Sequence, residues 1–284
     1  MLGFRIGDID VGIRDQTGCL PEPPPNVDCF RTTIRSTSAE AVFVEETPPN
    51  YTDYHEIFYD REWLRVMKGG DDFIFLFASD KKDYIEGFHF SHSKNQGRFY
   101  VKTENIGAQS AHPIESTPFQ LFFMLLLQSH QGFLLHANSV KIGDSGISFC
   151  GMSGSGKTTL CNLFSTFDDH TILTDETCLI RCDEDRVLIY GTPWKGSNSD
   201  YYANDKAELR RLYFIEHGAT NKIEPMNRLD AIGMAMLQSF PYFWDRACMT
   251  RNLHLIARVL SRVRYQRLAF VPNSSIVETI LMDI

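Results

Sequence analysis

The sequence predicts an α/β protein of two parts, a β-rich domain over residues 1–111 and an α/β domain over residues 112–284. Residues 1 to about 110 hold short runs in which apolar and polar residues alternate, separated by Gly, Asp, Asn and Ser clusters, and this pattern is typical of strands. From His112-Pro113 onward, helix-like and strand-like stretches alternate, as in α/β folds. The first part holds no motif that carries chemistry, so we assign it to recognition or to support of the second.

The second part begins with an apolar stretch that we interpret as a buried helix, capped by Ser116 or Thr117 and ended by Gly132. A polar stretch over residues 191–205 is long for a loop in a compact domain, and such loops are usually functional or mobile. We expect strands over residues 133–142, 147–151, 170–180, 185–191, 210–217 and 267–272, and helices over residues 157–167, 230–262 and 275–284.

Composition excludes several classes of function. The net charge of −8 argues against a nucleic-acid partner, because such proteins need a basic surface. The longest apolar patch, residues 119–127, is far shorter than the ~20 residues of a membrane span, and the N-terminus lacks the apolar core of a signal peptide. The seven cysteines form no CxxC pair, and Cys150 and Cys178 lie in apolar runs as expected for buried free thiols. A cytoplasmic protein without membrane contact is expected.

Residues 151–158, GMSGSGKT, fit the P-loop pattern G-x-x-x-x-G-K-[ST]. In such a loop the glycines let backbone N–H groups turn inward around a β-phosphate, and the following helix adds its positive N-terminus. Lys157 would reach the β- and γ-phosphates, and the Thr158 hydroxyl would ligate magnesium. The alternative is a plain glycine-rich turn. The predicted ATP-binding residues are Gly151, Ser153, Gly154, Ser155, Gly156, Lys157, Thr158 and Thr159.

Two adjacent carboxylates, Asp175 and Glu176, follow the P-loop helix in the sequence. We expect them near the carboxyl end of the next strand, at the edge of a parallel sheet where ligands bind. One carboxylate would bind the metal ion and the other would accept a proton from an attacking hydroxyl. A solvated strand end or a structural ion pair is the alternative.

The segment LLHANSVKIGDSGISFCGMSGSGKTTL, followed by HTILTDETCLI, resembles HPr kinase/phosphorylase, and its P-loop also resembles that of ATP-dependent phosphoenolpyruvate carboxykinase. The resemblance covers about residues 133–284 and implies a P-loop kinase domain of that type. It implies that Asp175 is the catalytic base, that Glu176 replaces a second aspartate, and that His136 lies near the transferred phosphate. A histidine in such an apolar run is as readily a core residue. Where HPr kinases carry a glutamate-x-arginine-glycine signature, this chain has LIYG over residues 188–191, so HPr itself is not implied as the substrate.

The leading hypothesis is an ATP- and Mg²⁺-dependent kinase that phosphorylates a serine or threonine hydroxyl of a protein or peptide. Some relatives of this type tailor ribosomally made precursor peptides, which makes such a peptide a candidate acceptor. One alternative is a kinase for a small metabolite or free amino acid. Another is a nucleotide-gated binding module that hydrolyses ATP weakly. The sequence leaves open whether the protein forms a homo-oligomer.

Overall fold

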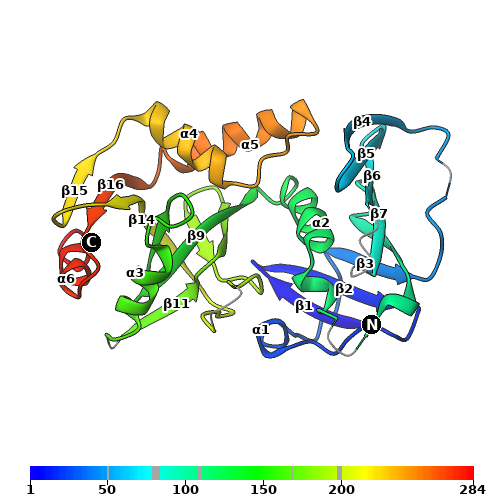
Figure 1. The fold of residues 1–284 in the computed structure, drawn as a ribbon, viewed down its shortest axis with the longest axis horizontal. Helices are drawn as coiled ribbons and strands as arrows, with labels where there is room; N and C mark the ends of the chain where they lie inside the picture. Colours follow the sequence, from blue (N-terminus) through cyan, green and yellow to red (C-terminus); the bar gives the residue numbers. More distant parts are fainter. Residues whose placement is uncertain (50, 79–83, 108–109, 168, 197–199) are drawn as a thin grey trace. The chain divides into compact units, whose positions relative to one another are not determined.

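The computed structural model describes residues 1–284 except 50, 79–83, 108–109, 168 and 197–199 (Figure 1). The chain divides into two compact units, Met1–Leu127 and Gln128–Ile284. Each contains an eight-stranded mixed sheet, so the mixed α/β class agrees with the sequence prediction. The boundary follows Leu127, whereas the sequence analysis places it after residue 111.

The sheet of the first unit has the order β1-β2-β3-β8-β7-β6-β5-β4. Its neighbours are antiparallel except for the β2–β3 and β3–β8 pairs, which are parallel. The strands are β1 (Leu2–Ile6), β2 (Ile9–Asp15), β3 (Ala39–Val44), β4 (His55–Asp60), β5 (Leu64–Gly69), β6 (Asp72–Phe77), β7 (Ile85–Ser91) and β8 (Gln96–Val101). The helices are α1 (Pro25–Asp28), α2 (Thr117–Leu127) and two 3₁₀ turns, η1 (Thr103–Asn105) and η2 (Pro113–Glu115).

Helix α2 belongs to the first unit because its aromatic side chains pack on that unit's sheet. The ring of Phe122 lies edge-on against the ring of Phe99 on β8, with 5.5 Å between the ring centroids. The ring of Phe119 stacks on that of Phe99, with 6.2 Å between the centroids. The helix begins as predicted, since the Ser116 hydroxyl accepts a hydrogen bond from the N–H of Phe119. The sequence identified the helix but not the sheet that it covers.

The second unit contains eight strands and four helices among the described residues. The strands are β9 (Gly132–Ile142), β10 (Ser145–Cys150), β11 (His170–Thr174), β12 (Thr177–Cys182), β13 (Val187–Tyr190), β14 (Lys206–His217), β15 (Lys222–Pro225) and β16 (Arg264–Phe270). The helices are α3 (Lys157–Phe164), α4 (Arg228–Gln238), α5 (Arg246–Val259) and α6 (Ser275–Leu281). The predicted helix over residues 230–262 is therefore two helices, and the predicted strand over residues 170–180 is interrupted at Asp175-Glu176.

Strand β9 organises this sheet, because it pairs with β10 on one side and with β11 and β12 on the other. All three partners are antiparallel to β9, so the expectation of a parallel sheet around Asp175 is wrong. Parallel pairing is found further along, between β10, β14 and β16. Because β10 and β11 both oppose β9, they run in the same direction, and their carboxyl ends point the same way.

The residues of β9 alternate between two hydrophobic cores. Leu135 and Ala137 belong to a core shared with α4 and α5, which supply Ala235 and Ile256. Val140 belongs to the opposite core, shared with α3 and α6. The helices thus cover both faces of the sheet, as α/β architecture requires. Cys150 and Cys178 are buried free thiols, as predicted. No described helix has both the length and the apolar character that crossing a membrane demands.

We predict that His112 makes the first unit acid-sensitive. The imidazole is 2% exposed, its Nδ1 accepts from the N–H of Ile114, and burial, aided by the charge of Arg31, lowers its pKa to about 4. An unfolded histidine has a pKa near 6.5, so protons favour the unfolded chain between these values. The contribution of His112 to the free energy of unfolding is complete above about pH 6.5, and it falls by about 3 kcal/mol as the pH drops to 4.

The variant His112→Asn keeps an acceptor at this position and removes the titration. Urea unfolding followed from pH 4 to 7.5 should show a weaker pH dependence in the variant than in the wild type. Equal slopes in the two proteins would contradict the assignment.

Candidate functional site

Residues 151–158, which match the P-loop pattern and are called the P-loop below, connect β10 to α3, the strand–loop–helix order of that pattern. Two of its glycines have left-handed backbones, Gly154 with φ 78° and Gly156 with φ 99°. Gly156 is the N-cap of α3, which therefore begins at Lys157. The imidazole Nε2 of His217, at the end of β14, donates to the carbonyl of Gly154 at 2.8 Å and so holds the turn from outside.

Two glycines of the loop are required by close packing as well. A Cβ on Gly156 would lie 2.6 Å from Cζ of Phe270 on β16, and a Cβ on Gly151 would lie 2.5 Å from the Ser155 hydroxyl. A Cβ on Gly154, by contrast, would meet nothing within 4 Å. The loop is thus pressed against the sheet at its two ends and open at Gly154.

Lys157 points back into the loop. Its side chain is 8% exposed, and Nζ donates to the carbonyls of Gly151 at 2.8 Å and Met152 at 3.3 Å. Burial lowers the pKa of the ammonium group, whereas the nearby carboxylate of Glu176 acts in the opposite direction. The hydroxyl of Ser155, also in the loop, is buried and has no hydrogen-bond partner in the described part of the chain.

Asn138 anchors α3 to β9, and sequence analysis missed it. The residue is fully buried, and its Nδ2 donates to the backbone carbonyl of Lys157 and to Sγ of Cys161 at 3.0 Å. The first turn of α3 is thereby fixed to the central strand. An amide in the otherwise apolar run FLLHANSV was the available signal, since a buried polar side chain needs partners.

Asp175 and Glu176 lie across β9 from the start of the P-loop. They interrupt the pairing with β9 between Thr174, opposite Ser139, and Thr177, opposite His136. On its other side, the intervening Ala137 of β9 pairs with Cys150, the last residue of β10. Strands are about 4.8 Å apart, so roughly 10 Å of backbone separation joins the carboxylate pair to the loop. This distance is within the reach of a bound triphosphate.

The Asp175 carboxylate is 3% exposed. Its Oδ1 accepts the N–H of Gly196 at 3.1 Å, and a Cβ on that glycine would lie 2.9 Å from Oδ2. Gly196 thus lies against Asp175, and Tyr202, further along the polar segment, forms a β-bridge with Thr174. Burial raises the pKa of the Cys161 thiol on α3, and the nearby Asp175 carboxylate raises it further. Asp175 therefore lies close to α3.

Glu176 pairs with His136, Oε1 to Nδ1 at 3.2 Å. This hydrogen bond lowers the pKa of Glu176, partial burial acts against it, and the charges of His136 and Lys157 lower it further. The ring of Phe240, which follows α4, meets the His136 ring edge-on at 6.5 Å. Lys157, Glu176 and His136 therefore form one electrostatically connected group.

The remaining sequence-predicted residues lie around this group without side-chain hydrogen bonds in the described contacts. Ser153 and Thr158 are exposed and Thr159 is half-buried. The described residues contain no cluster of three His, Cys, Asp or Glu side chains that alone holds a metal ion.

We predict that Gly156→Ala destabilises the second unit more than Gly154→Ala. Both variants place a Cβ on a left-handed backbone, which costs about 1–2 kcal/mol. Only the alanine at position 156 also collides with Phe270, and overpacking of this kind adds about 1–3 kcal/mol. Chemical unfolding of the two variants and the wild type measures the difference. Equal losses would mean that Phe270 does not confine the loop.

Comparisons with known proteins give little beyond this geometry. No family model and no curated protein matches the chain. Among solved structures, the HPr(Ser) kinase/phosphatase from Coxiella burnetii is similar, with 10% sequence identity over 53% of this chain and 91% of that chain, at a TM-score of 0.28. The likeness concerns about half of the chain and is too low to carry an argument about activity.

Proposed function

We propose that the protein is an ATP- and Mg²⁺-dependent kinase that transfers a phosphoryl group to a serine or threonine hydroxyl of a protein or peptide. The observation that carries the proposal is the buried carboxylate of Asp175, held at the level of the sheet where the P-loop begins. A phosphate-binding loop alone is compatible with many functions. A buried carboxylate beside it is typical of transfer to an alcohol.

The loop residues fit a nucleotide. The open space at Gly154 and the unpartnered hydroxyl of Ser155 leave room and a donor for phosphate oxygens. Lys157 donates to two loop carbonyls that a phosphate oxygen can replace as its partner. The proposed contacts are the backbone of residues 151–159 and the Lys157 ammonium. ATP supplies the phosphoryl group, and Mg²⁺ neutralises charge on its oxygens.

Thr158 and Glu176 are the proposed protein ligands of the magnesium ion. Thr158 is exposed and lies in the first turn of α3, next to Lys157, and Glu176 has a pKa held low by His136 and Lys157. A carboxylate that stays ionised is a suitable ligand for a hard cation. His136 orients Glu176 through their hydrogen bond.

Asp175 is the proposed base. In phosphoryl transfer the transition state is loose, so the base chiefly aligns the acceptor hydroxyl and takes its proton late. A nucleotide-gated binding module needs no such group, which is why we place catalysis first. The sequence resemblance supports a protein or peptide as the acceptor.

We predict that Lys157→Ala weakens MgATP binding about 10- to 100-fold, because a charge-assisted hydrogen bond contributes about 1.5–3 kcal/mol. Transfer should be lost while the fold persists. Titration calorimetry with MgATP measures the affinity, and Lys222→Ala, an exposed lysine of β15, is the matched control. A large drop in the melting temperature of the nucleotide-free variant would instead make Lys157 a structural residue.

We predict that Asp175→Asn lowers phosphoryl transfer about 10²- to 10⁴-fold, the usual contribution of a general base. MgATP affinity should stay within a few-fold, since Lys157 and the loop amides are unchanged. Transfer of labelled phosphate to serine peptides measures the first quantity and calorimetry the second. Asp144→Asn, in the exposed β9–β10 turn, controls for loss of charge. Near-normal transfer in Asp175→Asn would rule out Asp175 as the base.

A further inference from the structure

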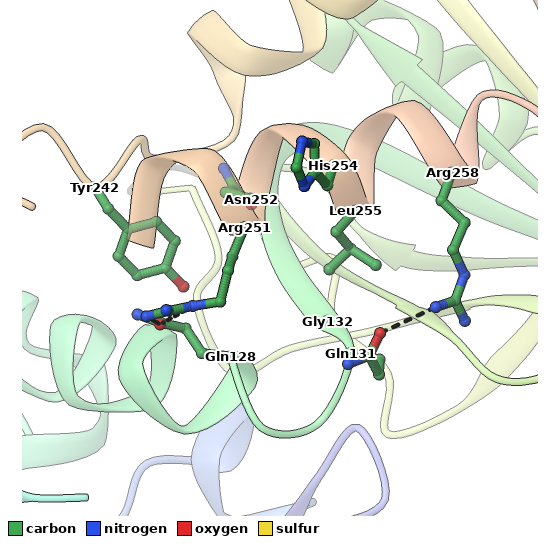
Figure 2. Close-up of a pocket in the computed structure, with 9 residues that line it drawn as sticks. All are labelled: Gln128, Gln131, Gly132, Tyr242, Arg251, Asn252, His254, Leu255 and Arg258. Atoms are coloured by element: carbon green, nitrogen blue, oxygen red, sulfur yellow. Dashed lines mark hydrogen bonds between the residues drawn. The ribbon is translucent and has the colours of Figure 1, made fainter. Parts of the chain in front are cut away.

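A cavity of about 230 Å³ lies between α5 and the residues that lead into β9 (Figure 2). Arg251, Leu255 and Arg258 line it from one face of α5, and His254 lines it as well. None of the described residues that line the cavity is acidic. In a chain with a net charge of −8, a cavity with two guanidinium groups is a local positive site.

The two arginines are held in place by neutral groups. Arg251 donates twice to Oε1 of Gln128, at 2.6 and 3.1 Å, and Arg258 donates to Oε1 of Gln131 at 3.1 Å. Figure 2 shows both side chains reaching from α5 toward these glutamines. Among the described residues neither guanidinium forms an ion pair, and Nε of Arg258 is buried without a hydrogen-bond partner. The positive charges are thus oriented but not neutralised.

A carboxylate fits these donors. Arg258 is further held by the backbone carbonyls of Cys182 and Asp183, whereas Nε and Nη2 of Arg251 share one amide oxygen, Oε1 of Gln128. A carboxylate can replace that oxygen, because hydrogen bonds between a guanidinium and a carboxylate are about twice as strong as neutral ones. The cavity is smaller than the roughly 300–1,000 Å³ of typical small-molecule pockets, but it has room for an acidic side chain.

Two segments connect this cavity to the candidate active site. Gly132 lines the cavity and lies on β9 four residues before His136, which is about 13 Å along a strand. Tyr242 lines the cavity and lies two residues after Phe240, whose ring packs on His136. The cavity residue Asn252 donates to Ser239, which precedes Phe240. An extended peptide of roughly four residues covers the strand distance.

We propose that the cavity binds an acidic side chain of the acceptor peptide, about four residues from the hydroxyl that is phosphorylated. This inference rests on the proposed kinase function and names the substrate class, a serine or threonine peptide with a nearby glutamate or aspartate. The acidic residue sets the register of the peptide over Asp175.

The test uses the full chain and fluorescein-labelled 13-residue peptides with a central serine in an alanine–glycine background. One glutamate is walked through positions −6 to +6, and a matched set carries glutamine instead. Fluorescence anisotropy measures binding without requiring transfer. We expect the best glutamate peptide, with its acidic residue three to five positions from the serine, to bind at least tenfold more tightly than its glutamine counterpart.

Variants assign this preference to the cavity. Arg251→Gln and Arg258→Gln should each reduce the glutamate preference at least threefold, whereas Arg246→Gln, an exposed arginine of α5 outside the cavity, should leave it unchanged. Arg258→Lys keeps the charge but loses the paired donors, and it should lose part of the preference. Melting curves identify any variant that fails to fold. If Arg258→Gln does not fold, Arg251→Gln still tests the proposal.

Two results would overturn the proposal. Equal binding of glutamate and glutamine peptides would exclude an acidic anchor. Binding of free succinate or inorganic phosphate that depends on Arg251 and Arg258, with no peptide preference, would make the cavity a small-anion site. The kinase proposal is tested by a different measurement. If the wild type did not bind MgATP, the kinase proposal would fail, whereas the measured preference for glutamate peptides would still stand.

Discussion

The attachment of α3 to β9 is the constraint on which the second unit's site depends. Asn138, fully buried in the middle of β9, donates its amide hydrogens to the first turn of α3, and this fixes where the P-loop ends. The same strand pairs with β10, from which the loop begins, and carries His136 beside Glu176. One strand therefore sets the positions of the loop, the lysine and the carboxylate pair. An amide without these partners would leave a polar group unsatisfied in the core, so the helix and the strand cannot separate cheaply.

Burial of charge is the second theme. Lys157 and Asp175 are both buried, and the structure gives each a neutral hydrogen-bond partner rather than an opposite charge. Unpaired buried charges are costly, so natural proteins keep them chiefly where they serve a ligand. Glu176 differs, because it is partly exposed and already paired with His136. Lys157 and Asp175 are thus the groups of the site that a ligand would stabilise, whereas Glu176 already has His136 as its partner.

Local pattern predicted what local chemistry determines. Neighbouring residues were enough to predict the glycine turn, the helix that begins at Lys157 and the buried thiols of Cys150 and Cys178. The partners were not. Pairing of β11 with β9, contact of Phe270 with Gly156 and the bond from Asn138 to α3 join residues far apart in the chain, and periodicity contains no information about them. The same reason explains why the sequence analysis groups α2 with the second part, since its sequence gives an apolar helix but not the sheet that its rings touch.

The seven cysteines divide by burial into two populations, five buried thiols in the second unit, Cys182 and Cys248 among them, and two exposed thiols in the first. Cys150, Cys161 and Cys178 lie beneath the P-loop and around Asn138, and burial raises the pKa of each thiol, to about 12 for Cys178. Only a thiolate attacks an electrophile, so these three sulfurs are inert in the folded chain near neutral pH. Cys19 and Cys29 are exposed, and both belong to the first unit. A maleimide dye added to the native protein would accordingly mark the unit without the P-loop, and reaction at the buried thiols would report the opening of the other.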